Sequence, residues 1–346
     1  MKTSFRLISI PLTVVLVAAI ALLWGGWRYA NEPLDGFADP LDIQVPSGSS
    51  LHRVAGELAA AGVLDHPRLF VWLGRMQDKA DIRAGEYRLH PGMSRQQILE
   101  RMHRGEVLMH RLTVVEGWQF RDLRAALEVH EAVENTLTGE SIEAVMAALG
   151  HADEHPEGRF FPDTYTFSRG TTDLAILRQA YERMEQTLNQ VWSERQEGLP
   201  FDTAYEALIL ASLIEKETGA PHERRQIAGV FVRRLEQGMR LQTDPTTVYG
   251  MDDFSGVVRP RHLRRDHPWN TYTRGGLPPT PIALPGEASL RAAVDPKPGD
   301  SLYFVSRGDG THHFSATLQE HNRAIDRYLR GNRNRGETPE ETDGDT

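Results

Sequence analysis

An uninterrupted apolar run near the N-terminus constrains this chain more than any other feature of its sequence. Residues 7–27 contain no charged side chain, and about 20 apolar residues in a helix suffice to cross a hydrocarbon core of roughly 30 Å. Lys2 and Arg6 precede the run, whereas residues 28–40 carry three acids. Because basic flanks stay on the cytoplasmic side, we expect residues 1–6 to be cytoplasmic and 7–27 to form a single-pass transmembrane helix in the inner (cytoplasmic) membrane.

A cleaved secretory signal is the alternative interpretation of this run. Signals have a shorter apolar region and a small-x-small cleavage site. Ala19 and Ala21 could form such a site, but they lie inside the apolar run, and Leu-Leu-Trp follows them. The sequence therefore favours an uncleaved anchor. In both cases the rest of the chain is exported, so the expected location of the main domains is periplasmic or extracytoplasmic.

The length and composition exclude several classes of function. A chain of 346 residues can form two or three domains. Its formal net charge of -9 argues against a nucleic-acid partner, because neutralising phosphates requires a basic surface. There is no cysteine, which excludes thiol catalysis, disulfides and thiolate metal sites.

A strand-turn-helix pattern recurs three times within residues 41–130. Residues 45–58, 89–102 and 114–127 each have an extended apolar lead-in, a turn containing glycine, and apolar residues at helical spacing. Their i, i+4 apolar pairs are Val54 and Leu58, Ile98 and Met102, and Leu123 and Leu127. Such units resemble LysM-like glycan-binding modules, although a short strand-turn-helix repeat is also a general packing unit.

The remaining segments differ in composition and periodicity. Residues 28–40 are rich in acids, glycine and proline and are predicted to be a tether. Residues 131–200 are predicted to be a mainly helical connecting region, and 201–331 a catalytic domain of helices and a few short strands. The polar tail at 332–346 is predicted to be disordered. The expected fold class is α+β: one transmembrane helix, a LysM-like small α/β module, and a mixed α+β catalytic domain.

Two glutamates end the apolar helix that is predicted at 203–218. Glu217 shares a helix face with three apolar residues, whereas Glu215 lies about 200° away around the axis. Apolar neighbours and the negative end of the helix dipole both disfavour an ionised Glu217, so both raise its pKa. A carboxylic acid that keeps its proton near neutral pH can act as the general acid in glycosidic cleavage. The alternative is that both glutamates are solvated helix-end residues.

Several long motifs surround this helix in a fixed order. They are "EGRFFPDTY", "ASLIEKETG", "IAGVFVRRLEQGMRLQTDPTTVYG", "WNTYTRGGLPPTPIALPG" and "HHFSATLQEHN". With the N-terminal run, they make essentially the whole chain resemble the endolytic murein transglycosylase family, the YceG-like proteins.

The resemblance implies a specific reaction. Members of the family cleave the β-1,4 bond between N-acetylmuramic acid and N-acetylglucosamine within peptidoglycan strands, without water, and leave 1,6-anhydro ends. It implies that Glu217, the second acid of the E-K-E-T motif, is catalytic. It also implies peptidoglycan glycan strands as substrate, peptidoglycan synthases as partners, and no metal or other cofactor.

The same motifs supply the candidate substrate-binding residues, which are Gln242, Asp244, Asn270 and Tyr272. An aspartate before proline often only starts a turn, and Asn270 and Tyr272 could be hydrogen-bonding residues of the core. The chain departs from the usual family pattern at Trp269, where tyrosine is common, and at Thr280, where glycine is common. These departures put substrate preference in doubt more than reaction type.

Two other functions are compatible with parts of the sequence. His312, His313 and His321 could belong to a metal-dependent peptidoglycan hydrolase, but adjacent strand residues point to opposite faces and no H-E-x-x-H motif occurs. A membrane-tethered, non-enzymatic glycan-binding scaffold of the cell-wall synthesis machinery is the second alternative. Only an activity measurement separates that scaffold from a transglycosylase.

Overall fold

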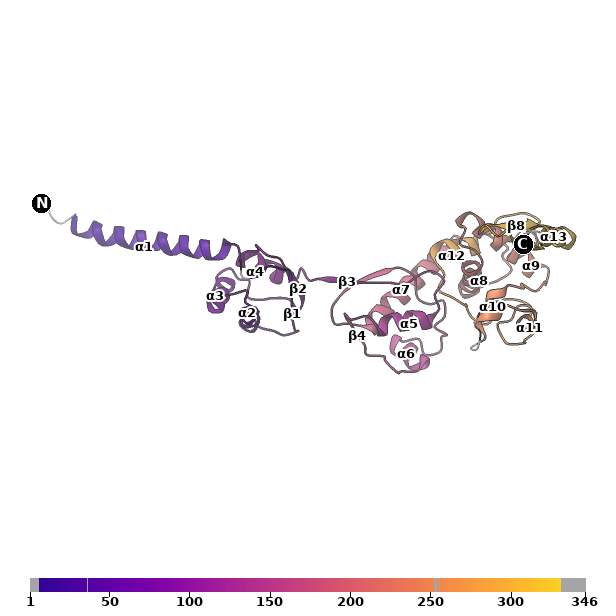
Figure 1. The fold of residues 1–346 in the computed structure, drawn as a ribbon, viewed down its shortest axis with the longest axis horizontal. Coiled ribbons are helices and arrows are strands. Elements are labelled where there is room, and N and C mark those ends of the chain that lie inside the picture. Colours follow the sequence, from indigo (N-terminus) through magenta and orange to yellow (C-terminus); the bar gives the residue numbers. More distant parts are fainter. Residues whose placement is uncertain (1–5, 36, 252–253, 255, 331–346) are drawn as a thin grey trace, which may run out of the picture. The chain divides into compact units, whose positions relative to one another are not determined.

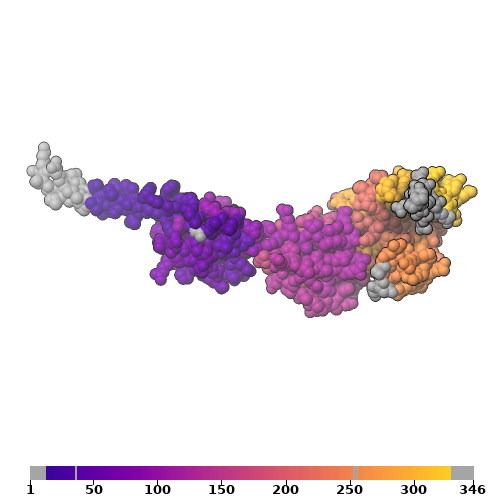
Figure 2. Space-filling model, in the orientation of Figure 1, coloured from indigo at the N-terminus to yellow at the C-terminus, as the bar shows by residue number. Residues whose placement is uncertain are grey.

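The computed structural model describes residues 6–35, 37–251, 254 and 256–330 (Figures 1 and 2). It divides the chain into two compact units, residues 1–111 with 166–171, and residues 112–165 with 172–346. Both contain helices and two-stranded sheets, which confirms the α+β class. Residues 1–5 of the predicted cytoplasmic segment and the predicted disordered tail lie outside the described residues.

The apolar run forms helix α1 (Arg6–Asn31). Its part from Thr13 to Asn31 is long and apolar enough to cross a membrane, and almost none of it is buried by the rest of the protein. A membrane anchor and a signal sequence both have this form. The helix extends beyond the predicted end at residue 27.

The segment after α1 is packed against the first unit, so the prediction of a tether over 28–40 is wrong for its first part. Ala30 and Leu34 are each only 4% exposed and belong to the core of this unit. The hydroxyl group of Tyr29 donates a hydrogen bond to the carbonyl oxygen of His66 at 3.1 Å. The tether prediction counted acids and prolines and missed these apolar contacts.

The first unit is built on a two-stranded antiparallel sheet. Its elements are β1 (Leu41–Val45), α2 (Leu51–Ala60), α3 (Pro67–Met76), β2 (Gly85–Leu89) and α4 (Arg95–Arg104). Leu41 lies opposite Leu89 in the register of β1 and β2. The predicted helices begin at side-chain caps, with Ser50 before α2 and Ser94 before α4. The i, i+4 pairs of the first two repeats are completely buried, as their spacing predicts.

The second unit contains the remaining elements. They are β3 (Met109–Thr113), α5 (Phe120–Glu128), β4 (Val133–Glu134), α6 (Ile142–Leu149), β5 (Thr164–Ser168), β6 (Thr171–Thr172), α7 (Asp173–Ser193), α8 (Ala204–Glu217), the short 3₁₀ helix η1 (Pro221–Glu223), α9 (Arg224–Glu236), α10 (Asp244–Tyr249), α11 (Pro260–Leu263), α12 (Glu287–Val294), β7 (Tyr303–Ser306), β8 (His312–Ser315), α13 (Leu318–Ile325) and the π-helical turn η2 (Asp326–Arg330). Strands β3 and β5 pair, and both pass from one unit into the other. Strands β7 and β8 form an antiparallel hairpin.

The units do not divide at residues 130 and 200, where the sequence placed its boundaries. The third repeat, residues 114–127, contains nearly all of α5 and lies wholly in the second unit. There the N–H of Gly117 donates to the carbonyl oxygen of Leu284 at 2.9 Å, and the N–H of Leu284 donates to that of Trp118 at 2.7 Å. Helix α7, from the predicted connecting region, contributes Leu188 and Val191 to the same core as α8. Shared apolar contacts therefore join three predicted segments into one unit.

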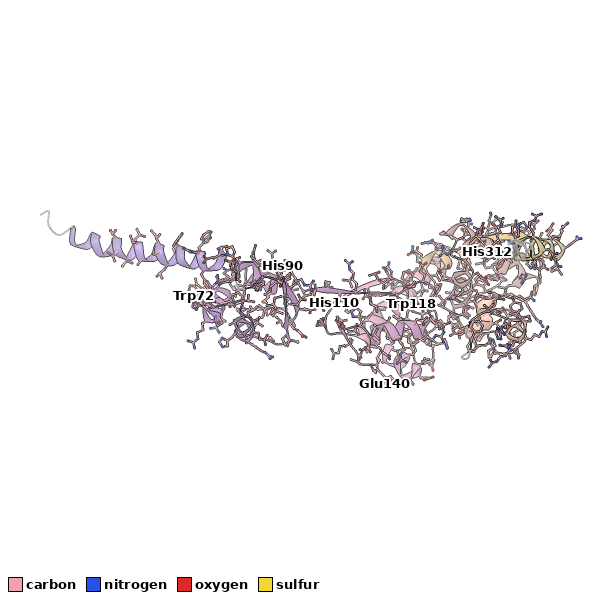
Figure 3. The ribbon with its side chains drawn as sticks, in the orientation of Figure 1. Trp72, His90, His110, Trp118, Glu140 and His312 are labelled. Carbon is pink, nitrogen blue, oxygen red and sulfur yellow. The ribbon has the colours of Figure 1, made fainter. Side chains whose placement is uncertain are left out.

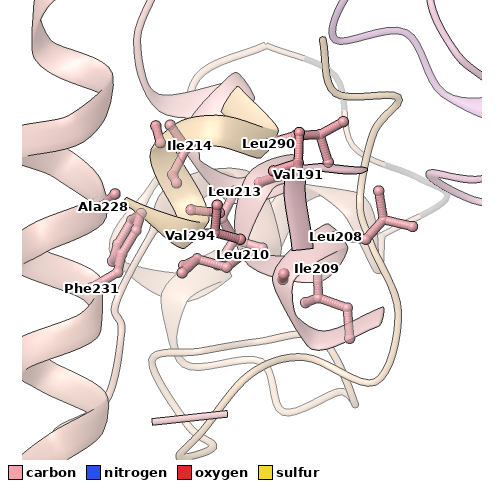
Figure 4. Packing of buried hydrophobic residues seen from close by; sticks show 14 of the residues in the cluster. Val191, Leu208, Ile209, Leu210, Leu213, Ile214, Ala228, Phe231, Leu290 and Val294 are labelled. Carbon is pink, nitrogen blue, oxygen red and sulfur yellow. The ribbon is translucent and has the colours of Figure 1, made fainter. Parts of the chain in front are cut away.

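Apolar side chains of helix α8, among them Leu210 and Leu213, belong to the buried apolar cluster of the second unit (Figure 4). All eight residues from Ala207 to Ile214 are buried, so the helix is covered on every side. Its neighbours are α7, α9, α10 and α12. A helix that is apolar all round is stable only inside a core. This burial fixes the position of the last turn of α8 and of the two glutamates on it.

Gly229 in α9 allows the helix to approach the chain after α12. A Cβ atom at this position would lie 2.4 Å from the backbone carbonyl oxygen of Lys297. Gly229→Ala should therefore lower the free energy of unfolding by about 1–3 kcal/mol, although alanine is the better helix former. Thermal unfolding of the two proteins checks this. An alanine variant at least as stable as the parent would show that the approach is not tight.

Candidate active site

The last turn of α8 places Glu217 at the edge of the core. The helix begins with a capping box in which Thr203 accepts from the N–H of Glu206 and Glu206 accepts from the N–H of Thr203. It ends after Glu217, because Thr218 is extended, with φ −142° and ψ 134°. The carboxyl group thus lies at the negative end of a helix whose other residues are fixed by packing.

The surroundings of Glu217 favour its protonated form. Burial raises its pKa to about 7, and the negative charge of Asp244 also raises it. A hydrogen bond donated by Thr243 Oγ1 to Glu217 Oε1 and the charge of His312 act in the opposite direction. A carboxyl group with this pKa holds a proton near neutral pH and can transfer it. The sequence predicted this direction.

Glu217 lines a cavity of about 460 Å³, within the range of about 300–1,000 Å³ that is usual for ligand sites. Three of the four predicted substrate-binding residues, Gln242, Asp244 and Tyr272, line the same cavity. Its other lining residues are Arg234, Leu241, Tyr303, Phe304, Val305, Ser306, His312, Leu318, His321 and Ile325. The hairpin β7–β8 and α13 therefore form the wall facing the candidate acid.

Gln242 lies two residues before α10, and Asp244 is the first residue of that helix. Gln242 has φ +53°, a left-handed backbone conformation that is uncommon for a residue other than glycine. Asp244 accepts a hydrogen bond of 2.5 Å from the hydroxyl group of Tyr272. Burial and this bond both raise the pKa of Tyr272, so it stays a donor. Asp244 and Tyr272 therefore form a hydrogen-bonded polar pair in the cavity of Glu217.

Asn270 occupies a different position from the other candidates. Its side chain is completely buried, and its amide nitrogen donates to the carbonyl oxygens of Leu263 and Arg265 at 3.1 and 2.8 Å. Its Oδ1 accepts from the N–H of Tyr272 at 2.8 Å. Asn270 does not line the cavity, unlike the other three candidates, so its predicted substrate contact stays a prediction. It is a positioning residue that fixes the loop carrying Tyr272.

Two charged groups of the cavity were not assigned to the site by the sequence. Arg234 is 7% exposed and donates to the carbonyl oxygens of Leu241 and Leu302 at 2.8 and 2.6 Å. His312 Nδ1 lies 2.8 Å from Oε2 of the buried Glu223. Since this bond occupies Nδ1, Nε2 is the ring nitrogen left for a ligand. No motif in the sequence singled out Arg234 as a cavity residue.

Glu215 differs from Glu217 by its partners, not by exposure. Its side chain is 6% exposed, with Oε1 3.5 Å from Nη2 of Arg224. Its Oε2 accepts a hydrogen bond from the N–H of Gly286 at 3.0 Å. A solvated position for the two glutamates, the alternative that the sequence left open, is therefore excluded. Glu215 joins α8, α9 and the start of α12.

The three histidines considered as metal ligands do not converge. His313 lies against Tyr328, and His321 stacks on Tyr303, whereas His312 is held by Glu223. In the part of the chain that the structure describes, no three histidine or acidic side chains are grouped as a metal site requires.

Two further cavities continue from the one at Glu217 within the second unit. The first, of about 400 Å³, shares Asp244 with it. The second, of about 480 Å³, shares Gln119, Arg121 and Tyr249 with the first. The series of hollows suits a polymer longer than one sugar.

Comparison with known proteins identifies the family. The family model described as YceG-like matches residues 43–327. The chain belongs to the YceG-like family. It is 32% identical over 333 residues to the endolytic murein transglycosylase of Bacillus subtilis, covering 91% of each chain.

Two further similar proteins share 24% and 27% identity with this chain. The endolytic murein transglycosylase of Streptococcus pneumoniae is 24% identical over 343 residues, which span 88% of this chain and 62% of that protein. The crystal structure of a YceG-like protein from Listeria monocytogenes aligns with a TM-score of 0.53 and 27% identity, covering 82% of this chain and 98% of that one.

The two departures from the usual YceG-like pattern contact each other. The indole N–H of Trp269 donates a hydrogen bond of 2.9 Å to Oγ1 of Thr280. Tyrosine and glycine at these positions could not make this bond. The two substitutions therefore act as a pair, and the indole ring lines the cavity that lies farther along the series.

The "EGRFFPDTY" segment supplies a buried acid. Glu157 accepts hydrogen bonds from the N–H of Phe120 at 3.0 Å and from the hydroxyl group of Tyr249 at 3.1 Å. Burial raises its pKa to about 7. Phe160 is completely buried and stacks on Phe120. The segment is thus a packed loop that ties α5 to α10, and Glu157 lines the last cavity.

Proposed function

We propose that this chain is a membrane-anchored endolytic lytic transglycosylase, a lyase acting on peptidoglycan. It cleaves the β-1,4 bond between N-acetylmuramic acid and N-acetylglucosamine within glycan strands and leaves 1,6-anhydro-N-acetylmuramic acid ends. The observation that carries this proposal is a single carboxyl group, Glu217, with a pKa of about 7 beside a polar cavity. The names of its Bacillus and Streptococcus relatives support the same reaction.

The proposed mechanism uses one residue twice. Protonated Glu217 first gives its proton to the glycosidic oxygen as the bond from C1 to that oxygen breaks. The resulting carboxylate then takes the proton of the 6-hydroxyl group of the same muramic acid, whose oxygen bonds to C1. An internal nucleophile needs no second carboxylate to activate water, and it has the advantage of being intramolecular. Glu217 regains its proton, so no co-reactant is consumed.

Polar residues of the cavity hold the sugar during these steps. Gln242, Asp244 and Tyr272 face the same space as the acid, so we place them at sugar hydroxyl and acetamido groups. His312 offers Nε2 to the same space. Asn270 positions Tyr272 by accepting a hydrogen bond from its backbone N–H. The further cavities on the other side of Asp244 accommodate the continuing strand, as cleavage within a strand requires.

The location follows from the N-terminal helix. We place α1 in the cytoplasmic membrane with the N-terminus inside and both units outside, where new strands emerge. Tethering raises the local concentration of the site at the membrane surface. Release of growing strands would place the enzyme beside peptidoglycan synthases. We also propose glycan contact by the first unit, as the LysM-like pattern suggests.

Mass spectrometry of digested sacculi tests the reaction. The full-length protein should release fragments that end in 1,6-anhydro sugars. Fragments with reducing ends would contradict the internal nucleophile and indicate a hydrolase. Binding of sacculi without any release would support the non-enzymatic scaffold instead.

The activity should fall as the pH rises through about 7, because the general acid must be protonated. Asp244→Asn removes a negative charge that raises the pKa of Glu217, so the alkaline limb of kcat should move to lower pH. His312→Asn removes a contribution that lowers this pKa, so the limb should move to higher pH. Measuring kcat against pH for the three proteins checks the signs. Two shifts in the same direction would contradict this electrostatic description.

A further inference from the structure

Helix α3 presents an exposed face that combines apolar and basic side chains. Leu69, Trp72 and Met76 are 46%, 55% and 65% exposed. Arg68 and Arg75 are exposed beside them. Positions i, i+1, i+4, i+7 and i+8 lie on one side of a helix. The opposite side packs into the core of the first unit through Phe70, Val71, Leu73 and Gly74.

This face has no role in the fold of its own unit. A large exposed tryptophan beside two other large apolar side chains usually marks a contact surface. Neither arginine forms an ion pair or hydrogen bond with any residue that the structure describes. The face therefore offers apolar area together with two uncompensated positive charges.

The position of α3 relative to α1 indicates what covers it. The hydroxyl group of Tyr29, near the end of α1, bonds the carbonyl oxygen of His66, the residue before α3. Arg95 strengthens the contact between α1 and the rest of the first unit, because its guanidinium carbon lies 4.4 Å from the centre of the Tyr29 ring. Trp27, 65% exposed, precedes Tyr29 by only about 3 Å along the helix axis. Tryptophan and tyrosine at the end of an apolar helix belong at the lipid–water interface.

The exposed face is turned toward the side on which α1 extends. Figure 3 shows Trp72 on the side of the first unit from which α1 leaves it. If α1 crosses the bilayer, this side of the unit faces the outer surface of the same bilayer. The apolar stripe and its two arginines then lie at headgroup depth.

We propose that α3 is a second membrane contact, with Leu69, Trp72 and Met76 inserted among the lipids and Arg68 and Arg75 bound to anionic headgroups. The proposal rests on the proposed membrane anchoring by α1. Apolar residues beside basic ones are typical of helices that lie in the interface plane, and each basic residue near an anionic surface adds attraction. Contact at two places fixes the orientation of the first unit on the membrane, which a single helix leaves free.

The absence of cysteine makes this testable at single positions. Single-cysteine variants of the full-length chain, Val17→Cys, Leu69→Cys, Met76→Cys and His90→Cys, carry a fluorescent label and are reconstituted in phosphatidylcholine vesicles containing phosphatidylglycerol. Quenching by nitroxide-bearing lipid reports insertion, and quenching by iodide reports water. His90 is exposed on a different side of the same unit and is the matched control.

We expect lipid-borne quenching at positions 17, 69 and 76, and iodide quenching at 90. Labels at 69 and 76 that respond only to iodide, with 17 in lipid, would overturn this inference and leave the anchor intact. A label at 17 that responds to iodide would instead overturn the anchor itself. Adding Arg68→Glu and Arg75→Glu should remove the lipid quenching at 76, and unchanged quenching would contradict the role of the two arginines.

Discussion

Glu217→Gln is expected to lower the rate of glycan cleavage by about 10²–10⁴-fold, while the fold remains intact. Glutamine is nearly isosteric and keeps an acceptor for Thr243 Oγ1, but it cannot give a proton to the leaving oxygen. The measurement is fragment release from sacculi by the purified full-length variant. Glu287→Gln, at an exposed position on α12 of the same unit, is the matched control and should retain full activity.

The same substitution should raise stability at alkaline pH. The pKa of Glu217 is about 7 when folded and 4.5 as an ordinary glutamate. The folded state therefore holds the proton more tightly, and the stability of the parent falls as the pH rises from 4.5 through 7. Glutamine avoids a penalty of up to about 3 kcal/mol above pH 7. Thermal unfolding at pH 5 and pH 8 should show a gain only at the higher value. A gain of the same size at both would contradict the raised pKa.

Glu215→Gln should have the opposite effect, a loss of stability. Glu215 is the buried partner of Arg224 and also accepts from the N–H of Gly286. Removing its charge leaves the guanidinium with Glu116, which is half exposed and 3.8 Å away. Breaking a buried pair in this way costs about 3 kcal/mol, or a fall in Tm of roughly 6–12 °C for a unit of this size.

Activity distinguishes the two glutamates further. Below its new melting temperature, the Glu215→Gln variant should retain kcat, because Glu215 does not line the cavity of Glu217. Its Tm is measured by thermal unfolding and its kcat by fragment release at low temperature. A variant with the Tm of the parent and no activity would show that Glu215 takes part in the chemistry, and would reverse the assignment.

The part of the fold that rests on local pattern was predictable. The helical spacing of the repeats predicted buried pairs such as Val54 and Leu58, and both residues are completely buried. Contacts between distant segments were not predictable from such patterns. The first part of the predicted tether at 28–40 is packed, because burial of Ala30 and Leu34 depends on residues far along the chain. The compact units likewise do not divide at the predicted boundaries of 130 and 200.

The candidate site likewise has features that the sequence predicted and features that it did not. The position of Glu217 at the end of an apolar helix predicted a raised pKa, and the motifs predicted that Gln242, Asp244 and Tyr272 accompany it. Sequence could not distinguish Asn270 from these three residues. An asparagine in a motif looks the same whether its amide binds a ligand or hydrogen-bonds to three backbone groups. Only the packed loop decides that.

Sequence alone therefore determined the membrane-length helix, the repeated local elements, the family and the choice of Glu217 as the candidate acid, because each depends on residue types at short spacing. The tertiary structure decided the partners of each charge. Glu215 pairs with Arg224, and His312 forms a hydrogen bond with Glu223. Glu217 accepts a hydrogen bond from Thr243 and lines an open cavity. The physical reason is that a pKa and an ion pair depend on burial and distance in space. Those are set by segments up to about a hundred residues apart in the chain.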